Sequence, residues 1–214
     1  MSTLRFLPVI LLFTILIGAC GRSDLIRIRM LAPVTEDKKD YAIFTDTTSS
    51  SSFTPTITNK NVGASLYFLF KSIGLGYTTI TTKMEKADEK LTEKTTLVTN
   101  FADVAFGIGE NYTFMWGAGV LTGGKWETSL EYDSKTFNPK HNYLGGHSLF
   151  FVLGHHGFGF ETLLGYRTNS IKAEFEEINP SDEDIGKTGK DFTYESNIIS
   201  LKTSQVQLGI GFTF

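Results

Sequence analysis

Apolar and polar residues alternate along most of this chain, and the alternation is clearest in its last nine residues. Every second residue there is apolar: Val206, Leu208, Ile210, Phe212 and Phe214. Gln, Gly or Thr stands between them. Successive side chains of a β-strand point to opposite faces, so this stretch predicts a strand with one apolar and one small or polar face. The chain ends on the aromatic residue Phe214. A transmembrane barrel strand ends on an aromatic residue more readily than an edge strand of a soluble sheet does.

The same pattern recurs in seven further stretches, which makes eight predicted strands. They cover residues 41–47, 62–70, 73–84, 95–108, 112–121, 142–153, 158–175 and 192–214. Beyond residue 121, we expect the face that begins with Tyr112 to continue through Trp126 and Tyr132. Gly123-Gly124 is therefore interpreted as a bend in a protruding hairpin arm.

The connections between the predicted strands alternate in length. Short turns are expected at Lys71-Ser72, Gly109-Glu110-Asn111 and Gly154-His155-His156-Gly157, and long connections join residues 47 to 61, 84 to 95, 121 to 142 and 175 to 192. The charged residues 85–94 are interpreted as a loop, with a helix as the competitor because Ala, Glu and Lys favour helices. Transmembrane barrels have an even number of strands, with short turns on one side and long loops on the other. The sequence therefore predicts an all-β, eight-stranded antiparallel up-and-down transmembrane β-barrel over residues 41–214.

The first nineteen residues have the pattern of a signal helix. Arg5 precedes the apolar run Phe6–Ile17, which is too short to span a bilayer comfortably, and the small residues Gly18-Ala19 follow it. Residues 1–19 are therefore predicted to be a secretory signal peptide that is removed from the mature protein.

A single cysteine, Cys20, follows the predicted signal peptide, so no intramolecular disulfide can form. The stretch Leu16–Cys20 resembles a bacterial lipoprotein box, which implies cleavage before Cys20 and diacylation of its thiol. Ordinary cleavage that leaves a free thiol is the alternative. We interpret residues 20–40 as a periplasmic linker, in which Leu25–Met30 could also form a short strand.

Charge excludes one class of partner. The chain has 20 Lys and Arg residues against 23 Asp and Glu residues, and no basic cluster stands out in the sequence. Binding to nucleic acid is therefore not expected.

A soluble up-and-down barrel would turn its apolar face inward. Here the second face of most predicted hairpins carries Gly, Thr, Gln and charged residues, which indicates a polar interior instead.

With its signal peptide, its alternating turns and loops and its terminal Phe214, the chain resembles the small eight-stranded bacterial outer-membrane proteins of the outer membrane protein A, X and W type. The resemblance implies a barrel in the outer membrane with its C-terminus in the periplasm. It also implies that Phe212 and Phe214 form an assembly signal read by the barrel assembly machinery. The expected partners are this machinery and outer-membrane lipid, and the expected state is a monomer. The resemblance carries no site motif, so fold alone assigns no function.

Five polar residues fall on the predicted interior face: Asp103, Glu161, Arg167, Gln205 and Gln207. Because a buried charge needs a partner, we expect Glu161 or Asp103 to pair with Arg167. Eight strands enclose just enough room for side chains. These residues therefore favour a structural polar plug over a conduction path.

Candidate catalytic residues are few. His147-Ser148 together with Glu161 could suggest an outer-membrane lipid hydrolase, but neighbours on one strand point to opposite faces, so His147 cannot easily activate Ser148. His155-His156 could bind a metal, although no third ligand stands nearby in the sequence. We expect no catalysis, no metal and no cofactor. The expected role is structural or in surface interaction, with a narrow channel for small or apolar solutes and a lipid-modifying enzyme as the alternatives.

Overall fold

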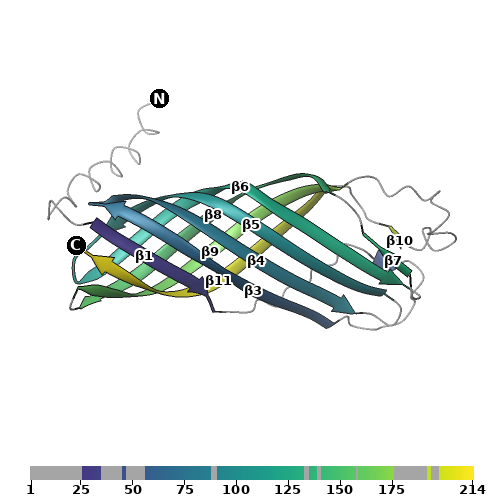
Figure 1. Ribbon diagram of the computed structural model, residues 1–214, viewed down its shortest axis with the longest axis horizontal. Coiled ribbons are helices and arrows are strands. Elements are labelled where there is room, and N and C mark those ends of the chain that lie inside the picture. Colours follow the sequence, from purple (N-terminus) through teal and green to yellow (C-terminus); the bar gives the residue numbers. More distant parts are fainter. Residues whose placement is uncertain are drawn as a thin grey trace, which may run out of the picture.

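Eight long antiparallel strands form one closed sheet in the computed structural model, which describes residues 26–34, 45–46, 56–87, 91–132, 135–138, 141–157, 159–175, 192–193 and 198–214. The strand order is β5-β4-β3-β1-β11-β9-β8-β6, and the pairing of β5 with β6 closes the barrel (Figure 1). The predicted all-β up-and-down barrel is confirmed. The barrel strands are β1 (Ile26–Pro33), β3 (Thr56–Phe70), β4 (Ile73–Ala87), β5 (Leu91–Ile108), β6 (Tyr112–Tyr132), β8 (His141–Gly157), β9 (Phe160–Phe175) and β11 (Ile198–Thr213).

Three short strands complete the described structure. β7 (Lys135–Phe137) pairs with the far end of β6, and β2 (Thr45–Asp46) pairs with β10 (Phe192–Thr193) in a separate two-stranded sheet. Among the described residues, no helix is long and apolar enough to cross a bilayer. The predicted signal peptide, residues 1–19, and the predicted lipidation site, Cys20, lie outside the described residues.

The first barrel strand differs from the sequence-based prediction. β1 lies between β3 and β11, with Ile28 opposite both Phe68 and Phe212. The barrel therefore begins at Ile26, within the segment 20–40 that was expected to be a linker, and residues 41–47 are not its first strand. The reason is the alternation of Ile and Arg in β1, which directs Arg27 and Arg29 into the interior instead of leaving them in solvent.

Both ends of the barrel chain meet at one rim, which we name the turn end. Ile26 and Phe214 exchange two backbone hydrogen bonds, of 3.1 and 2.9 Å, so the first and last strands close the rim. Figure 1 shows the C-terminus beside the start of β1. The predicted turns at Lys71-Ser72 and at Gly109–Asn111 lie at the same end, and the backbone φ of Gly109 is +98°, which favours glycine. The opposite rim, which carries β2, β7 and β10, is named the loop end.

Two predicted connections are in fact strand. Residues 85–94 were expected to form a loop, but Glu85 pairs with Lys94, and only residues 88–90 separate β4 from β5. Glu85 and Lys94 face outward whereas Met84 and Glu93 are buried, so the strand alternation continues into this hairpin in spite of its charges. Residues 154–157 were expected to form a turn, but they belong to β8, and the chain reverses between Gly157 and Phe160. Gly159 has a φ of +86° there, so the turn uses the next glycine along the chain.

A β-bulge in β6 reverses the inward and outward positions of that strand. Asn100 pairs with Gly123 and Phe101 with Leu121, so Thr122 is an extra residue in β6. Its hydroxyl donates to the Asn100 carbonyl oxygen at 3.2 Å. One inserted residue moves every later side chain to the opposite face. The prediction that Trp126 continues the face of Tyr112 is therefore wrong, because Trp126 points inward and is buried.

The outer wall near the turn end is covered by exposed apolar side chains, which we name the apolar belt. Gly, Ala or a polar residue alternates with them and faces inward at most positions. The belt comprises Met30, Val62, Leu66, Phe68, Phe70, Ile73, Leu75, Tyr77, Val104, Tyr112, Phe114, Val120, Leu149, Phe151, Leu153, Phe160, Leu164, Tyr166, Leu208, Ile210 and Phe212.

Toward the loop end, the outer face of the wall becomes polar. The outward residues become Thr, Lys and Glu, whereas the interior holds an apolar cluster built on Ile80, Leu97, Phe101, Trp126 and Leu201. A second apolar cluster, which includes Leu31, Tyr67 and Leu163, lies in the interior nearer the turn end. The outer wall is thus apolar near the turn end and polar near the loop end, where the interior combines an apolar cluster with buried polar side chains such as Thr82, Glu93 and Thr95.

Closure between β1 and β11 can be tested with a disulfide. In a Cys20→Ser background, the variant Ile28→Cys/Phe212→Cys places two thiols on directly opposed residues, so it should oxidise to an intrachain cross-link. A mobility shift on a non-reducing gel measures it. The matched variant Ile28→Cys/Val206→Cys, six residues further along β11, should not cross-link. Equal cross-linking of both pairs would contradict the register.

Candidate functional site in the barrel interior

Arg167 of β9 lies at the centre of the interior, fully buried. Its Nη1 and Nη2 atoms donate to the two carboxylate oxygens of Asp103, both at 2.9 Å. Such a two-pronged ion pair is among the stronger interactions between side chains. The pair spans the barrel from β9 to β5, so it ties together strands that are not neighbours in the sheet.

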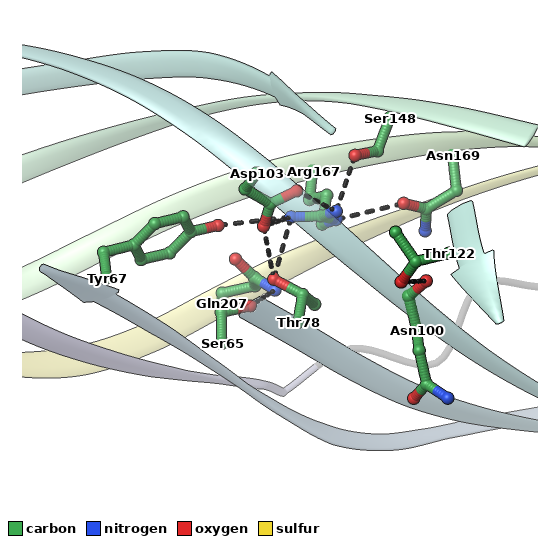
Figure 2. Close-up of polar contacts among 10 residues, drawn as sticks. All are labelled: Ser65, Tyr67, Thr78, Asn100, Asp103, Thr122, Ser148, Arg167, Asn169 and Gln207. Atoms are coloured by element: carbon green, nitrogen blue, oxygen red, sulfur yellow. Dashed lines mark hydrogen bonds and ion pairs between the residues drawn. The ribbon is translucent and has the colours of Figure 1, made fainter. Parts of the chain in front are cut away.

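Each nitrogen of the Arg167 guanidinium has a further partner (Figure 2). Nε donates to the Asn169 side-chain oxygen at 3.1 Å, and Nη2 donates to the Ser148 hydroxyl at 2.5 Å. Nη1 donates to the hydroxyl oxygens of Tyr67 at 3.2 Å and Thr78 at 3.1 Å. We name these residues with Arg167 and Asp103 the arginine cluster. A buried charge is tolerated only when it is paired and hydrogen-bonded in this way.

Aromatic rings and glycines shape the space around the cluster. The Arg167 guanidinium carbon lies 4.8 Å from the ring centre of Phe101 and 5.4 Å from that of Phe150, within the range of cation–π attraction. A Cβ atom on Gly119 would overlap the Asp103 carboxylate and the Ser148 hydroxyl. Gly119 therefore leaves the room that Asp103 occupies.

A second ionic group, the turn-end cluster, lies closer to the turn end. Arg29 donates to the two carboxylate oxygens of Glu161 at 2.7 and 2.9 Å and to the Thr113 hydroxyl at 2.8 Å. Arg27 donates to the carbonyl oxygen of Gly109 at 2.8 Å, and its Nε lies 3.9 Å from Glu161. These contacts join β1 to β6, β9 and a turn, so they also fix β1 in the barrel.

All five polar residues predicted to face the interior do lie there, buried. Asp103 and Arg167 are partners, whereas Glu161 pairs with Arg29 instead. Gln207 donates to the Ser65 hydroxyl at 3.3 Å, and Gln205 lies opposite Arg167 in the β11–β9 ladder. Phe212 and Phe214, the predicted assembly signal, face outward at the turn end.

Sequence reasoning missed Arg27, Arg29 and Tyr67. Both arginines were assigned to the periplasmic linker, although the alternation in Leu25–Met30, noted as a possible short strand, was the signal that could have revealed them. Tyr67 occupies an inward position between Leu66 and Phe68, where a third large side chain hid the alternation.

His147 and Ser148, the candidate catalytic residues, lie on opposite faces of β8. Ser148 faces inward and accepts a hydrogen bond from Arg167, whereas His147 is exposed on the outer wall. The hydroxyl and the imidazole are therefore on opposite faces, and a histidine base cannot reach this serine. Within the described part of the chain, no group of three His, Cys, Asp or Glu residues could hold a metal ion. The arrangement is suited to holding strands together, because each charged group is bonded to protein.

Comparison with known proteins finds only remote structural similarity. No family model matches it, and no curated protein does. Among solved structures, the chain is similar to the outer membrane protein OprG from Pseudomonas aeruginosa, with 10% identity and a TM-score of 0.42 over 90% of this chain and 97% of that one. It is also similar to Neisserial surface protein A (NspA), with 10% identity and a TM-score of 0.38 over 90% of this chain and 98% of that one. Neither likeness assigns a role to this chain.

The Asp103–Arg167 pair should contribute strongly to stability. Asp103→Asn leaves a buried guanidinium without its counter-charge and should lower the free energy of unfolding by about 3–5 kcal/mol. Arg167→Met combined with Asp103→Asn should lose less than the sum of the two single variants, because the two groups are coupled. Urea unfolding in detergent micelles measures all four proteins.

The exposed pair Lys125–Glu127 provides the control for this cycle. Its N–O distance is 2.5 Å, but both side chains are more than half exposed. Glu127→Gln should therefore cost less than about 1 kcal/mol. Additive effects of Asp103→Asn and Arg167→Met would show that the buried pair does not carry the coupling.

Proposed function

We propose that this chain is an integral β-barrel of a bacterial outer membrane, with its C-terminus on the periplasmic side and a structural or surface-interaction role without catalysis. The observation that carries the proposal is the apolar belt, because large apolar residues such as Leu164 and Ile210 are about half exposed on the wall. Monomeric soluble proteins rarely expose a contiguous apolar surface of this extent. A transmembrane barrel exposes it to lipid, with interior-facing residues alternating between.

The filled interior supports a structural role over a channel. The arginine cluster and the turn-end cluster occupy the axis within the belt, and the apolar cluster around Ile80 and Leu97 lies beyond them toward the loop end. Eight strands leave an interior only as wide as the side chains that fill it. A narrow path for small or apolar solutes remains the alternative, and it would require these clusters to separate. Ser148 faces the interior and His147 faces outward from the same strand, which disfavours a lipid-modifying enzyme that would use them together.

The loop half of the barrel is the expected surface for interaction. Its strands extend well beyond the belt. Their outward residues include Lys94, Lys125 and Glu127, whose charged groups favour contact with water. A surface pocket of about 520 Å³ lies there between the end of β6 and His141. Its volume is within the range of small-ligand sites. Partners from outside the cell would meet this half first.

The start of the barrel agrees with an anchor at the same rim. β1 begins at Ile26 at the turn end, and Cys20 stands only a few residues before it in the sequence. If residues 1–19 are a signal peptide and Cys20 is diacylated, as the sequence predicts, the lipid would insert into the periplasmic leaflet beside the barrel.

Membrane integration can be tested by extraction and gel mobility. The full chain expressed in a Gram-negative host should stay with the membrane pellet after carbonate treatment, because the belt is held by lipid. Its unheated band should migrate differently from the boiled sample, because a closed barrel resists unfolding in cold detergent. Release by carbonate would contradict the proposal. Stable conductance of the purified protein in planar bilayers would favour the channel alternative.

Recognition of the terminal aromatic residue can be separated from its contribution to the fold. Phe214 is 70% exposed, and its backbone bonds to Ile26 do not need the ring. Phe214→Ala should therefore leave in-vitro refolding into detergent nearly unchanged while lowering the outer-membrane level in cells. Leu208→Ala, at another exposed position of the same face, is the control and should not change the cellular level. Equal effects of both variants in cells would argue against recognition of the terminus.

A further inference from the structure

Four exposed lysines gather on one side of the outer wall. They are Lys60 on β3, Lys83 on β4, Lys172 on β9 and Lys202 on β11. The strand order β4-β3-β1-β11-β9 makes these strands neighbours, with β1 between the two pairs. We name the four residues the basic patch. β1 ends at Pro33, opposite Gln207, so it stops short of the level of Lys202.

The lysines of the patch face each other rather than carboxylates. Lys60 lies directly opposite Lys83, and like charges in that position repel. Lys202 pairs with Ser170 and Lys172 with Ser200, which makes these two lysines diagonal neighbours. Within the described part of the chain, no ion pair joins any of the four to an acidic residue.

Two other outward lysines of the loop half are compensated. Lys94 lies 3.9 Å from Glu85, and Lys125 lies 2.5 Å from Glu127. Among the described residues, two outward carboxylates stand close to the patch along its strands: Glu85, which pairs with Lys94, and Glu174, which makes no ion pair with Lys172. In the part of the chain that the structure describes, the excess positive charge of the outer wall therefore lies on the β1 side. Such an excess is stabilised by an anion from outside the chain.

The patch also lies at a defined position along the barrel axis, just beyond the apolar belt. Lys60 is two residues, about 7 Å, beyond the exposed Val62, and Lys202 lies on the loop side of Leu208 and Ile210 in the belt. If the belt spans the hydrocarbon layer, these ammonium groups reach the headgroup region of the leaflet that faces the loop end. Lysine binds phosphate there as a compact charge.

We propose that the basic patch binds the phosphate groups of phosphorylated lipids in the outer leaflet. The proposal rests on the membrane role argued above, and it adds a lipid class and a binding face. A lipid phosphate placed between Lys60 and Lys83 would turn their repulsion into two attractive contacts. The same lipid could reach Lys202 across the end of β1.

The test compares two double variants that remove the same charge. Lys60→Gln/Lys83→Gln removes the opposed pair, and Lys94→Gln/Lys125→Gln removes two compensated lysines. Each protein and the wild type are refolded into vesicles of phosphatidylcholine alone, with lipid A that carries two phosphates, or with the same lipid A after dephosphorylation. The midpoint of heat unfolding, followed by the gel-mobility shift, is measured in each.

Phosphorylated lipid A should raise the unfolding temperature of the wild type over phosphatidylcholine, and dephosphorylated lipid A should not. Lys60→Gln/Lys83→Gln should lose at least half of this rise, and Lys94→Gln/Lys125→Gln should keep most of it. In phosphatidylcholine alone, Lys60→Gln/Lys83→Gln should be at least as stable as the wild type, because a repulsion has been removed.

Three results would overturn the proposal. The first is no rise for the wild type with phosphorylated lipid A, and the second is an equal loss in both double variants. The third is failure of Lys60→Gln/Lys83→Gln to fold in phosphatidylcholine, which would show that these lysines support the fold itself. Failure of the wild type to insert into any vesicle is a different outcome, because it would contradict the membrane role rather than the lipid specificity.

Discussion

A guanidinium that is shut away from solvent must find a partner for its charge and for each of its donors, and the arginine cluster shows what this demands of the barrel. The partners of Arg167 come from β3, β4, β5 and β8 as well as from its own strand. A slip of one residue in any of these strands would turn its partner to the outer wall. The cluster therefore specifies the register of five of the eight barrel strands.

Specificity is the role that best explains a polar centre in this position. A well-packed apolar core is often as stable as a buried ion pair, so the pair is weak evidence for extra stability. An apolar interior, however, would tolerate shifted strands, because one apolar side chain replaces another with little loss. Asp103 has only Arg167 as its buried ionic partner in the described structure, and Gly119 is the residue that admits it. The turn-end cluster acts in the same way on β1.

The outer wall of the barrel is apolar near the turn end and charged near the loop end. Near the turn end the outside is apolar, so the interior can carry charges that are paired with one another. Beyond the bulge at Thr122 the outside carries charge, and the interior is apolar around Leu97 and Trp126, as in a soluble protein. The bulge moves the later side chains of β6 to the opposite face, so the aromatic ring of Trp126 points inward and not toward water.

Much of the architecture could be predicted from the sequence because period-two alternation is a direct consequence of strand geometry. It correctly indicated an eight-stranded barrel, in which seven predicted stretches match barrel strands, and the inward position of Asp103 and Arg167. The pairing of Glu161 could not be foreseen in the same way. Its partner Arg29 lies 132 residues away in the chain, in a short alternating segment that was assigned to the linker and not to the barrel.

Bulges and strand ends were the other limits of sequence reasoning. A single inserted residue such as Thr122 leaves the composition of a stretch unchanged, yet it reverses the face of everything that follows. The hairpin around residues 85–94 looked like a loop because its sequence is rich in charge. Exposed charges such as Glu85 and Lys94 are expected on strands that extend beyond an apolar belt into water.

The central claim is that one wall passes from lipid to water along a single strand, and β11 tests it most directly. Spin labels are placed one at a time at Ile210 and Lys202 in a Cys20→Ser background, after reconstitution into lipid vesicles. The label at Ile210 should collide with lipid-soluble oxygen and be shielded from a polar nickel quencher. The label at Lys202 should show the reverse. A label at Ile210 that is immobile and shielded from oxygen, or one that is open to the polar quencher, would contradict the account.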